Sequence, residues 1–288
     1  MNIRSRELPE GWYPGTKSGV SRQIDEFLKS ISKSSGLSGA ELRLKQKAVA
    51  GIAPHAGWAF SGQIALMVMQ RMSPETETFV VVGGHLLPSE GVLAAFEDGY
   101  ETPSGVIKAD LDLLEYLRLE LDPGKDSFAD NTVEVQLPFI KHLFPESRVL
   151  GLRAAPSQGS VHLGEILEKA SKVLNRRIAV IGSTDLTYYG PNYGFIPKGL
   201  GREAVRWVKE INDRRIIESL VNLDLSGALE RGVKEKSACS IGGAVAAVSF
   251  ARAAGAKRGE LLHYTTSYDL YPNESFVGYA GIIFPGNA

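Results

Sequence analysis

Cysteine is nearly absent from this sequence, which has one in 288 residues. A single cysteine cannot form an internal disulfide or a four-cysteine zinc site, so the chain is not a disulfide-stapled secreted scaffold. The first residues carry charge and proline where a secretion signal needs an apolar run of about 7 to 15 residues. These absences indicate a reducing compartment, and we expect a cytoplasmic protein.

The sequence also lacks an excess of charge of either sign. Its 32 lysine and arginine residues nearly balance 33 acidic ones, leaving a net charge of -1. Such a balance attracts neither nucleic acid nor an anionic membrane, and we expect no partner of either kind. The most apolar stretch, 238–256, is rich in alanine, glycine and serine and contains Arg252. It predicts a close-packed buried helix rather than a membrane span.

Short apolar segments alternate with amphipathic ones along the chain. Strands are predicted at 48–53, 79–82, 149–152, 178–181, 261–267 and 277–284, with a hairpin within 92–106. Helices are predicted at 20–31, ended by the Ser/Gly-rich stretch 32–39, and at 61–72, 111–119, 133–143, 161–174, 203–221 and 240–254. Such alternation is typical of a parallel sheet covered on both faces. We predict one domain over residues 1–288, a three-layer α/β/α sandwich with a central, mostly parallel sheet.

Three predicted strands end in residues that suit a binding site. The strand at 48–53 leads into His55, the strand at 79–82 leads through two glycines into His85, and the strand at 178–181 leads into Asp185. In open α/β sheets, ligands bind beyond these carboxyl ends. The small residues beside them would let the backbone approach a ligand or ion closely.

Cys239 directly precedes the predicted helix 240–254. A helix N-terminus lowers the pKa of a thiol and favours the thiolate. Together with His55 and His85 it offers two nitrogens and one sulfur, a set suited to Fe, Cu, Zn or Ni rather than Mg or Ca. Three ligands would leave a position for water, oxygen or substrate. Because the three residues are far apart and follow no fixed metal-binding spacing, ordinary core residues are the competing interpretation.

Two further segments suit either a structural or a functional role. The long loop 188–199, rich in glycine, proline and aromatics, is typical of a lid or binding loop. The helix predicted at 133–143 is preceded by Asp130 and Asn131, either of which could cap it, with Glu134 as the complementary acid.

Several motifs occur together in the order and at the approximate spacing of a known family. They are Pro54-His55-Ala56-Gly57-Trp58 with Ser61-Gly62, Glu134-Val135-Gln136-Leu137-Pro138-Phe139, Ser183-Thr184-Asp185-Leu186, and Cys239. Residues 11–14 and 275–280 fit the same family. Over essentially its full length the chain therefore resembles the Memo family.

The resemblance implies a fold related to the class III extradiol ring-cleaving dioxygenases, with a metal pocket at one rim of the sheet. It implies that His55, His85 and Cys239 hold the metal, with iron or copper and a redox role suggested for the family. Some bacterial and archaeal members are encoded in a system with a radical-SAM protein, which implies such a partner.

This sequence departs from the family at three places. Asn131 and Tyr188 stand where the family often has histidines, and 82–85 keeps only the histidine of a Gly-Pro-Ser-His pattern. Losing two imidazoles removes the best acid/base groups for neutral pH, although Tyr188 could donate a hydrogen bond. Ring-cleaving relatives use two histidines and a carboxylate, so a thiolate ligand changes the chemistry expected of the metal.

Our leading hypothesis is a metal-dependent oxidoreductase that acts on an unknown small substrate. Iron or copper would be bound by the two histidines and Cys239, with zinc as the alternative ion. The other predicted site residues are Asp185, Glu134 and Tyr188 as orienting or proton-carrying groups, and Trp12, Tyr13, Trp58 and Asn131 as the pocket lining. A zinc-type hydrolase and a non-catalytic scaffold that binds a peptide or partner remain alternatives.

Overall fold

The parallel centre of the sheet appears as predicted. The computed structural model describes residues 1–35, 47–128 and 130–286. Four strands lie side by side and parallel in the order β2 (Ala48–Ala53), β9 (Ile178–Ser183), β3 (Thr78–Gly83) and β8 (Arg148–Ala154). Each contains one predicted strand, and nearly all their residues are buried, as a parallel sheet covered on both faces requires.

Mostly antiparallel strands flank this centre. On one side β12 (Phe276–Pro285) pairs with β2, and both β11 (Glu260–Thr266) and β10 (Tyr188–Tyr189) pair with β12. On the other side β4 (Val92–Ala94) runs antiparallel to β8 and parallel to β7 (Gly124–Lys125). The strands predicted at 261–267 and 277–284 are confirmed, and they form one antiparallel flank.

The hairpin predicted within 92–106 forms over 99–108, two residues beyond the predicted range, and the first part of the segment is not part of it. β4 joins the main sheet, whereas β5 (Gly99–Tyr100) pairs with β6 (Ile107–Lys108) and with β1 (Ile3–Arg4) in a small second sheet. The two halves of the segment therefore belong to different sheets. Apolar patterning locates strand-like stretches but does not identify their partners.

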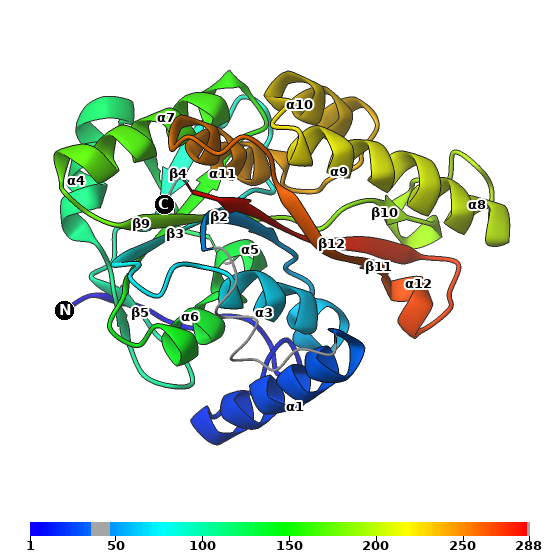
Figure 1. The fold of residues 1–288 in the computed structure, drawn as a ribbon, viewed down its shortest axis with the longest axis horizontal. Helices are drawn as coiled ribbons and strands as arrows, with labels where there is room; N and C mark the ends of the chain where they lie inside the picture. Colours follow the sequence, from blue (N-terminus) through cyan, green and yellow to red (C-terminus); the bar gives the residue numbers. More distant parts are fainter. Residues whose placement is uncertain (36–46, 129, 287–288) are drawn as a thin grey trace.

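Helices cover both faces of the sheet (Figure 1). One face carries α4 (Leu111–Leu121), α7 (Gln158–Val173), α9 (Asp213–Val221), α10 (Leu225–Lys234) and α11 (Ile241–Ala253), and the other carries α1 (Lys17–Ser35), α3 (Gln63–Gln70) and α6 (Leu137–Leu143). Alternate residues of β3 divide between these layers: Val80 and Val82 pack with α7 and α11, and Phe79 and Val81 with α1 and α3. The three-layer sandwich is confirmed.

Three predicted helices are divided in the structure. The segment 61–72 becomes π-helical η1 (Trp58–Gly62) and α3, 133–143 becomes α5 (Asn131–Glu134) and α6, and 203–221 becomes α8 (Arg202–Trp207), π-helical η3 (Val208–Asn212) and α9. Pro138 accounts for the second division, because proline is tolerated only in the first turn of a helix. Of the stretch 32–39 predicted to end the first helix, residues 36–39 lie outside the described residues.

Other short or unpredicted elements complete the chain. They are α10, the 3₁₀ turn η2 (Pro191–Tyr193) within the predicted loop 188–199, and α12 (Ser267–Leu270). Two glycines in α10, Gly227 and Gly232, lower its helix propensity and explain why the sequence pattern does not indicate it.

At two glycines, the backbone of helix α11 packs directly against the backbone of the sheet, with no room for side chains between them. A Cβ atom added to Gly242 would lie 2.2 Å from the carbonyl oxygen of Ala154, and one on Gly243 would lie 2.2 Å from that of Val82. This confirms the close-packed buried helix predicted from the composition of 238–256. Within the described ranges, no helix combines the length and apolar character needed to cross a bilayer.

A buried carboxylate holds the segment that follows β9. Asp213 accepts hydrogen bonds from the backbone amide of Thr187 at 3.1 Å, from the hydroxyl of the same residue, and from the hydroxyl of Tyr264 at 2.7 Å. Burial raises the pKa of Asp213 to about 7, although these hydrogen bonds lower it. Asp213 thereby fixes the turn between Asp185 and Tyr188.

We expect this carboxyl to make the protein less stable as the pH rises from about 4 to 7. Across that range the unfolded chain releases the Asp213 proton and the folded chain keeps it, so the free energy of unfolding falls with pH. Raising the pKa of this carboxyl group from its ordinary value to about 7 corresponds to about 4 kcal/mol. Urea denaturation at several pH values should show this fall in wild type and its loss in Asp213→Asn.

Asp269 provides a matched control for this measurement. Burial raises the pKa of Asp269, but hydrogen bonds from Lys209 and Thr266 outweigh it and lower the pKa to about 2. Its stabilising effect is lost only below about pH 4, so Asp269→Asn should keep the fall between pH 4 and 7. An equal pH dependence in wild type and Asp213→Asn would contradict the assignment.

Candidate metal centre

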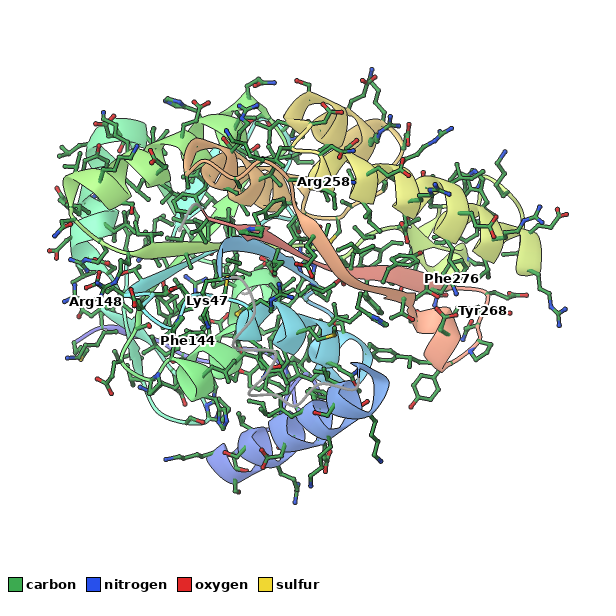
Figure 2. All side chains as sticks on the ribbon, viewed as in Figure 1. Lys47, Phe144, Arg148, Arg258, Tyr268 and Phe276 are labelled. Atoms are coloured by element: carbon green, nitrogen blue, oxygen red, sulfur yellow. The ribbon has the colours of Figure 1, made fainter. Side chains whose placement is uncertain are left out.

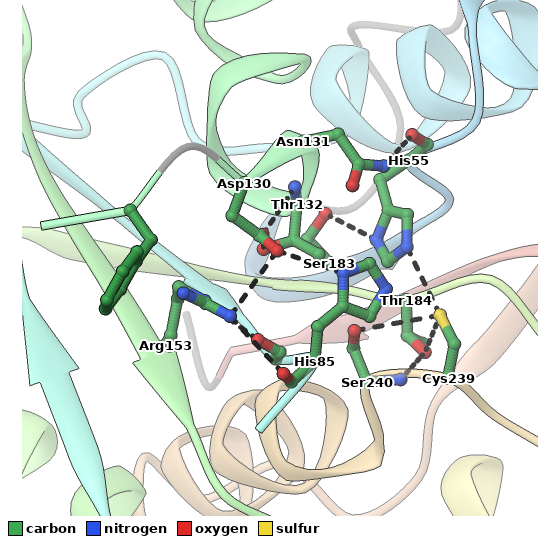
Figure 3. Close-up of polar contacts among 12 residues, drawn as sticks. His55, His85, Asp130, Asn131, Thr132, Arg153, Ser183, Thr184, Cys239 and Ser240 are labelled. Atoms are coloured by element: carbon green, nitrogen blue, oxygen red, sulfur yellow. Dashed lines mark hydrogen bonds and ion pairs between the residues drawn. The ribbon is translucent and has the colours of Figure 1, made fainter. Parts of the chain in front are cut away.

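Three ligand-type side chains meet where β2 and β3 end and α11 begins. The ligand atoms of His55, His85 and Cys239 lie within 4.8 Å of one another. His55 Nε2 is 3.2 Å from Cys239 Sγ, and the two imidazole rings lie nearly perpendicular with centroids 5.1 Å apart (Figure 3). The structure therefore brings together the three residues predicted as metal ligands.

Two glycines at the end of β3 make this convergence sterically possible. A Cβ on Gly83 would lie 1.8 Å from Thr132 Oγ1, and a Cβ on Gly84 would lie 2.6 Å from Ser240 Cβ. The chain therefore passes between α5 and the residue after Cys239 only because it has no side chains there. His85 follows with φ of 57°, in the left-handed region that non-glycine residues seldom adopt.

The second nitrogen of each imidazole faces an oxygen atom. His55 Nδ1 lies 3.3 Å from Ser183 Oγ, and His85 Nδ1 lies 3.0 Å from Asp130 Oδ2. These contacts leave the Nε2 atoms as the ligand positions. Metal-binding histidines are commonly oriented in this way, because the second ring nitrogen donates its hydrogen to a nearby oxygen.

The thiol and the first imidazole favour opposite charges. Burial raises the pKa of Cys239, but His55 and His85 outweigh it and lower the pKa below its ordinary value. Burial lowers the pKa of His55, but Cys239 and Asp185 outweigh it and raise the pKa. Without a metal, the favoured state is therefore a thiolate beside an imidazolium. Metal binding would release the imidazolium proton, because only neutral imidazole and thiolate are ligands.

Asp130 supplies a negative charge beside the second imidazole. Burial raises the pKa of its carboxyl group, but His85 and Thr132 outweigh it and lower the pKa to about 2. Asp130 is also the residue that caps α5, since its carboxylate accepts a hydrogen bond from the Thr132 amide at 2.9 Å. The predicted cap is thus confirmed for Asp130 rather than Asn131.

Three other predicted site residues hold the backbone around His55. Asp185 accepts hydrogen bonds from the His55 amide at 2.7 Å and from the Tyr188 hydroxyl at 2.8 Å. Burial and the Asp185 charge raise the pKa of Tyr188, which keeps the phenol protonated as a donor. Asn131 Nδ2 donates to the His55 carbonyl at 3.0 Å. Catalytic roles for Asp185 and Tyr188 stay predictions.

Glu134 and the aromatic residues predicted at the site make other contacts. The Glu134 carboxylate accepts hydrogen bonds from the Tyr13 hydroxyl at 2.6 Å and from two amides of the N-terminal segment. Trp58 stacks on Phe139 with centroids 3.8 Å apart, and its amide donates to the Trp12 carbonyl. These contacts anchor the N-terminal segment on α5 and η1, and the Trp58 stack joins η1 to α6. Proton transfer by Glu134 and a pocket-lining role for the aromatics stay predictions.

Sequence reasoning missed several residues around the site, among them Thr184 and Ser240, whose hydroxyl groups lie 3.8 and 3.7 Å from Cys239 Sγ, and Ser183 and Arg153. Ser183 is the last residue of β9, two residues before the acid that the sequence pattern singled out, but its contact with His55 depends on β2 and β9 being neighbours. Arg153 lies close to His85 and Asp130 and directly follows the predicted strand 149–152 (Figure 3). The rule that ligands gather at the carboxyl ends of strands could have found Arg153.

Fold and site together define an α/β/α sandwich protein with a candidate His/His/Cys metal centre. The sequence profile described as Memo-like protein matches residues 4–283, and the chain belongs to this family. It is 31% identical to a MEMO1 family protein of Thermococcus onnurineus and 32% identical to one of Pyrococcus abyssi, with 98% of this chain and 99% of each relative covered.

A solved structure shares the fold. The crystal structure of an uncharacterized protein from Escherichia coli K12 matches with a TM-score of 0.50 and 12% identity, over 82% of this chain and 99% of that one. At this identity the match supports the three-layer fold and carries no statement about activity.

We expect Cys239 of the metal-stripped protein to react with iodoacetamide at a lower pH than an ordinary cysteine. The reaction needs the thiolate, whose share falls only as the pH drops through the lowered pKa. His55→Gln removes the imidazolium and should move the midpoint up by about one pH unit or more. Alkylation rates between pH 5 and 9, followed by mass spectrometry, give the midpoints.

His162 is the control position for this prediction, because its side chain is 61% exposed and pairs with Glu165 within α7. His162→Gln should leave the midpoint of wild type unchanged. Identical midpoints for wild type and His55→Gln would show that the imidazole does not stabilise the thiolate.

Proposed function

We propose that this Memo-like protein binds one transition-metal ion, iron or copper, through His55, His85 and Cys239. We further propose that the centre performs redox or oxygen-related chemistry on a small substrate. The observation that carries the proposal is the convergence of two imidazoles and one thiolate-favouring sulfur within 4.8 Å.

The donor set fits such an ion. Imidazole nitrogen suits iron, copper and zinc, and thiolate sulfur favours the softer ions over Mg and Ca. Each imidazole has its second nitrogen beside an oxygen, so both rings are held ready for coordination through Nε2. When bound, iron or copper would supply one-electron chemistry and an open coordination position at this rim.

The surrounding residues shape the access to the centre. The His55 side chain is fully buried, whereas the His85 side chain is 33% exposed. A small substrate would therefore approach from the side of His85. On the buried side, Asp185 accepts hydrogen bonds from the His55 amide and the Tyr188 hydroxyl, which fixes the backbone of this ligand.

Metal content measured by mass spectrometry tests the proposal. Protein purified without chelator should contain about one equivalent of iron or copper, and Cys239→Ser and His55→Ala should contain at least about tenfold less, because each loses one of three ligands. The exposed-histidine variant His162→Ala should retain the wild-type content. Equal and negligible metal in all proteins would overturn the proposal. Zinc in place of iron or copper would overturn its redox part, since Zn²⁺ has no redox chemistry.

A further inference from the structure

We propose that Arg153 is a positioning residue for the ligand His85, an inference that rests on the proposed metal-binding function. Arg153 lies near the end of β8 and is only 6% exposed. Its guanidinium group lies between the end of β3 and the start of α5, beside both the backbone and the ring partner of His85 (Figure 3).

One planar side chain contacts several groups that determine where His85 lies. Arg153 Nε donates to the Gly84 carbonyl at 2.9 Å, and Nη2 donates to the His85 carbonyl at 3.4 Å. Nη2 also lies 3.5 Å from Asp130 Oδ2, the atom that faces His85 Nδ1. Arg153 therefore contacts the main chain of this ligand and the carboxylate that orients its ring.

The backbone at His85 explains why such a clamp is needed. A histidine at φ of 57° is in a sparsely populated conformation that surrounding contacts must stabilise. Two successive carbonyl groups, of Gly84 and His85, find their donors on the same guanidinium. The other terminal nitrogen of this guanidinium group, Arg153 Nη1, donates a hydrogen bond to Asp126 Oδ1 at 3.3 Å. Figure 2 shows that side chains fill the space between the sheet and the helices on both of its faces.

The arrangement requires arginine. Its rigid fork can reach two carbonyls and two carboxylates at once, whereas the lysine ammonium is a single point charge on a flexible stem. Lysine at this position would keep the charge near Asp126 and Asp130 and lose part of the contact with the His85 backbone.

Arg71 is a buried arginine at the C-terminal end of α3, beside the end of β2 that lies away from the centre. It is 5% exposed and pairs with Glu260 through two hydrogen bonds of 2.9 and 3.3 Å. Its carbonyl accepts a hydrogen bond from the amide of Ala48, at the start of the strand whose other end leads to His55. The Glu260 side chain is 48% exposed, so changes at Arg71 report the cost of disturbing a buried arginine in a partly exposed ion pair, without disturbing the ligands.

The experiment compares Arg153→Lys and Arg153→Gln with Arg71→Lys and Arg71→Gln in the full chain. Metal-stripped proteins are titrated with Co²⁺ alone, and binding is monitored by visible absorption. Their thermal unfolding is measured in the absence of metal. We expect the Arg153 variants to bind Co²⁺ about 10- to 100-fold more weakly, as is typical when a group that orients a ligand is lost.

The visible spectra of the cobalt-loaded proteins give a second measurement. In the Arg153 variants the d–d bands of Co²⁺ should shift, whereas the sulfur-to-cobalt charge-transfer band from Cys239 should persist. The Arg71 variants should lose thermal stability and keep wild-type affinity and bands.

Each outcome of this experiment decides the inference. Arg153→Lys keeps the positive charge. If Arg153→Gln does not fold, the comparison is made with Arg153→Lys alone. Wild-type affinity and bands in Arg153→Lys, or equal weakening in Arg71→Lys, would overturn the positioning role while leaving the proposed function intact. A wild-type protein that binds no Co²⁺ would overturn the proposed function and, with it, this inference.

Discussion

The close backbone approach at the end of β3 is the constraint on which the site depends. Gly83 and Gly84 have no room for a Cβ, because Thr132 lies on one side and Ser240 on the other. The same closeness continues along α11, whose glycines rest on carbonyl groups of β3 and β8. As a result, the residue after the glycines and the cysteine before the helix face each other across a few ångströms. Side chains at these glycines would separate the ligand atoms before any metal could join them.

The charges around this junction are arranged for a metal cation. The two histidines lower the pKa of the only cysteine. The Nδ1 atoms of the imidazoles face the Asp130 carboxylate and the Ser183 hydroxyl group. The cost of burying a thiolate is offset by the adjacent imidazolium, whose positive charge a metal ion would replace on binding. This explains how the three ligand side chains, one of them a fully buried histidine, can be held together before a metal ion binds.

Local sequence patterns predicted much of this molecule, and the rest depends on which strands become neighbours. The four central strands are short and largely apolar, so 48–53 and the others could be located, and the carboxyl-end rule brought His55 and His85 to one rim. Cys239 was grouped with them from its place before a helix, and the resemblance to the Memo family favoured this set over the competing interpretation of ordinary core residues. The partner of each residue could not be predicted: the 92–106 segment divides between two sheets, and Ser183 reaches an imidazole 128 residues away. Such pairings are set by packing over the whole chain.

The central claim is that one sulfur and two imidazoles bind the same metal ion. X-ray absorption at the edge of the metal that copurifies with the protein tests it most directly, because the fine structure reports the ligand atoms. The account predicts one sulfur scatterer at about 2.3 Å, the usual metal–thiolate distance, together with the outer-shell pattern of two imidazoles. A shell of oxygen and nitrogen atoms without sulfur, or without imidazole scattering, would contradict it.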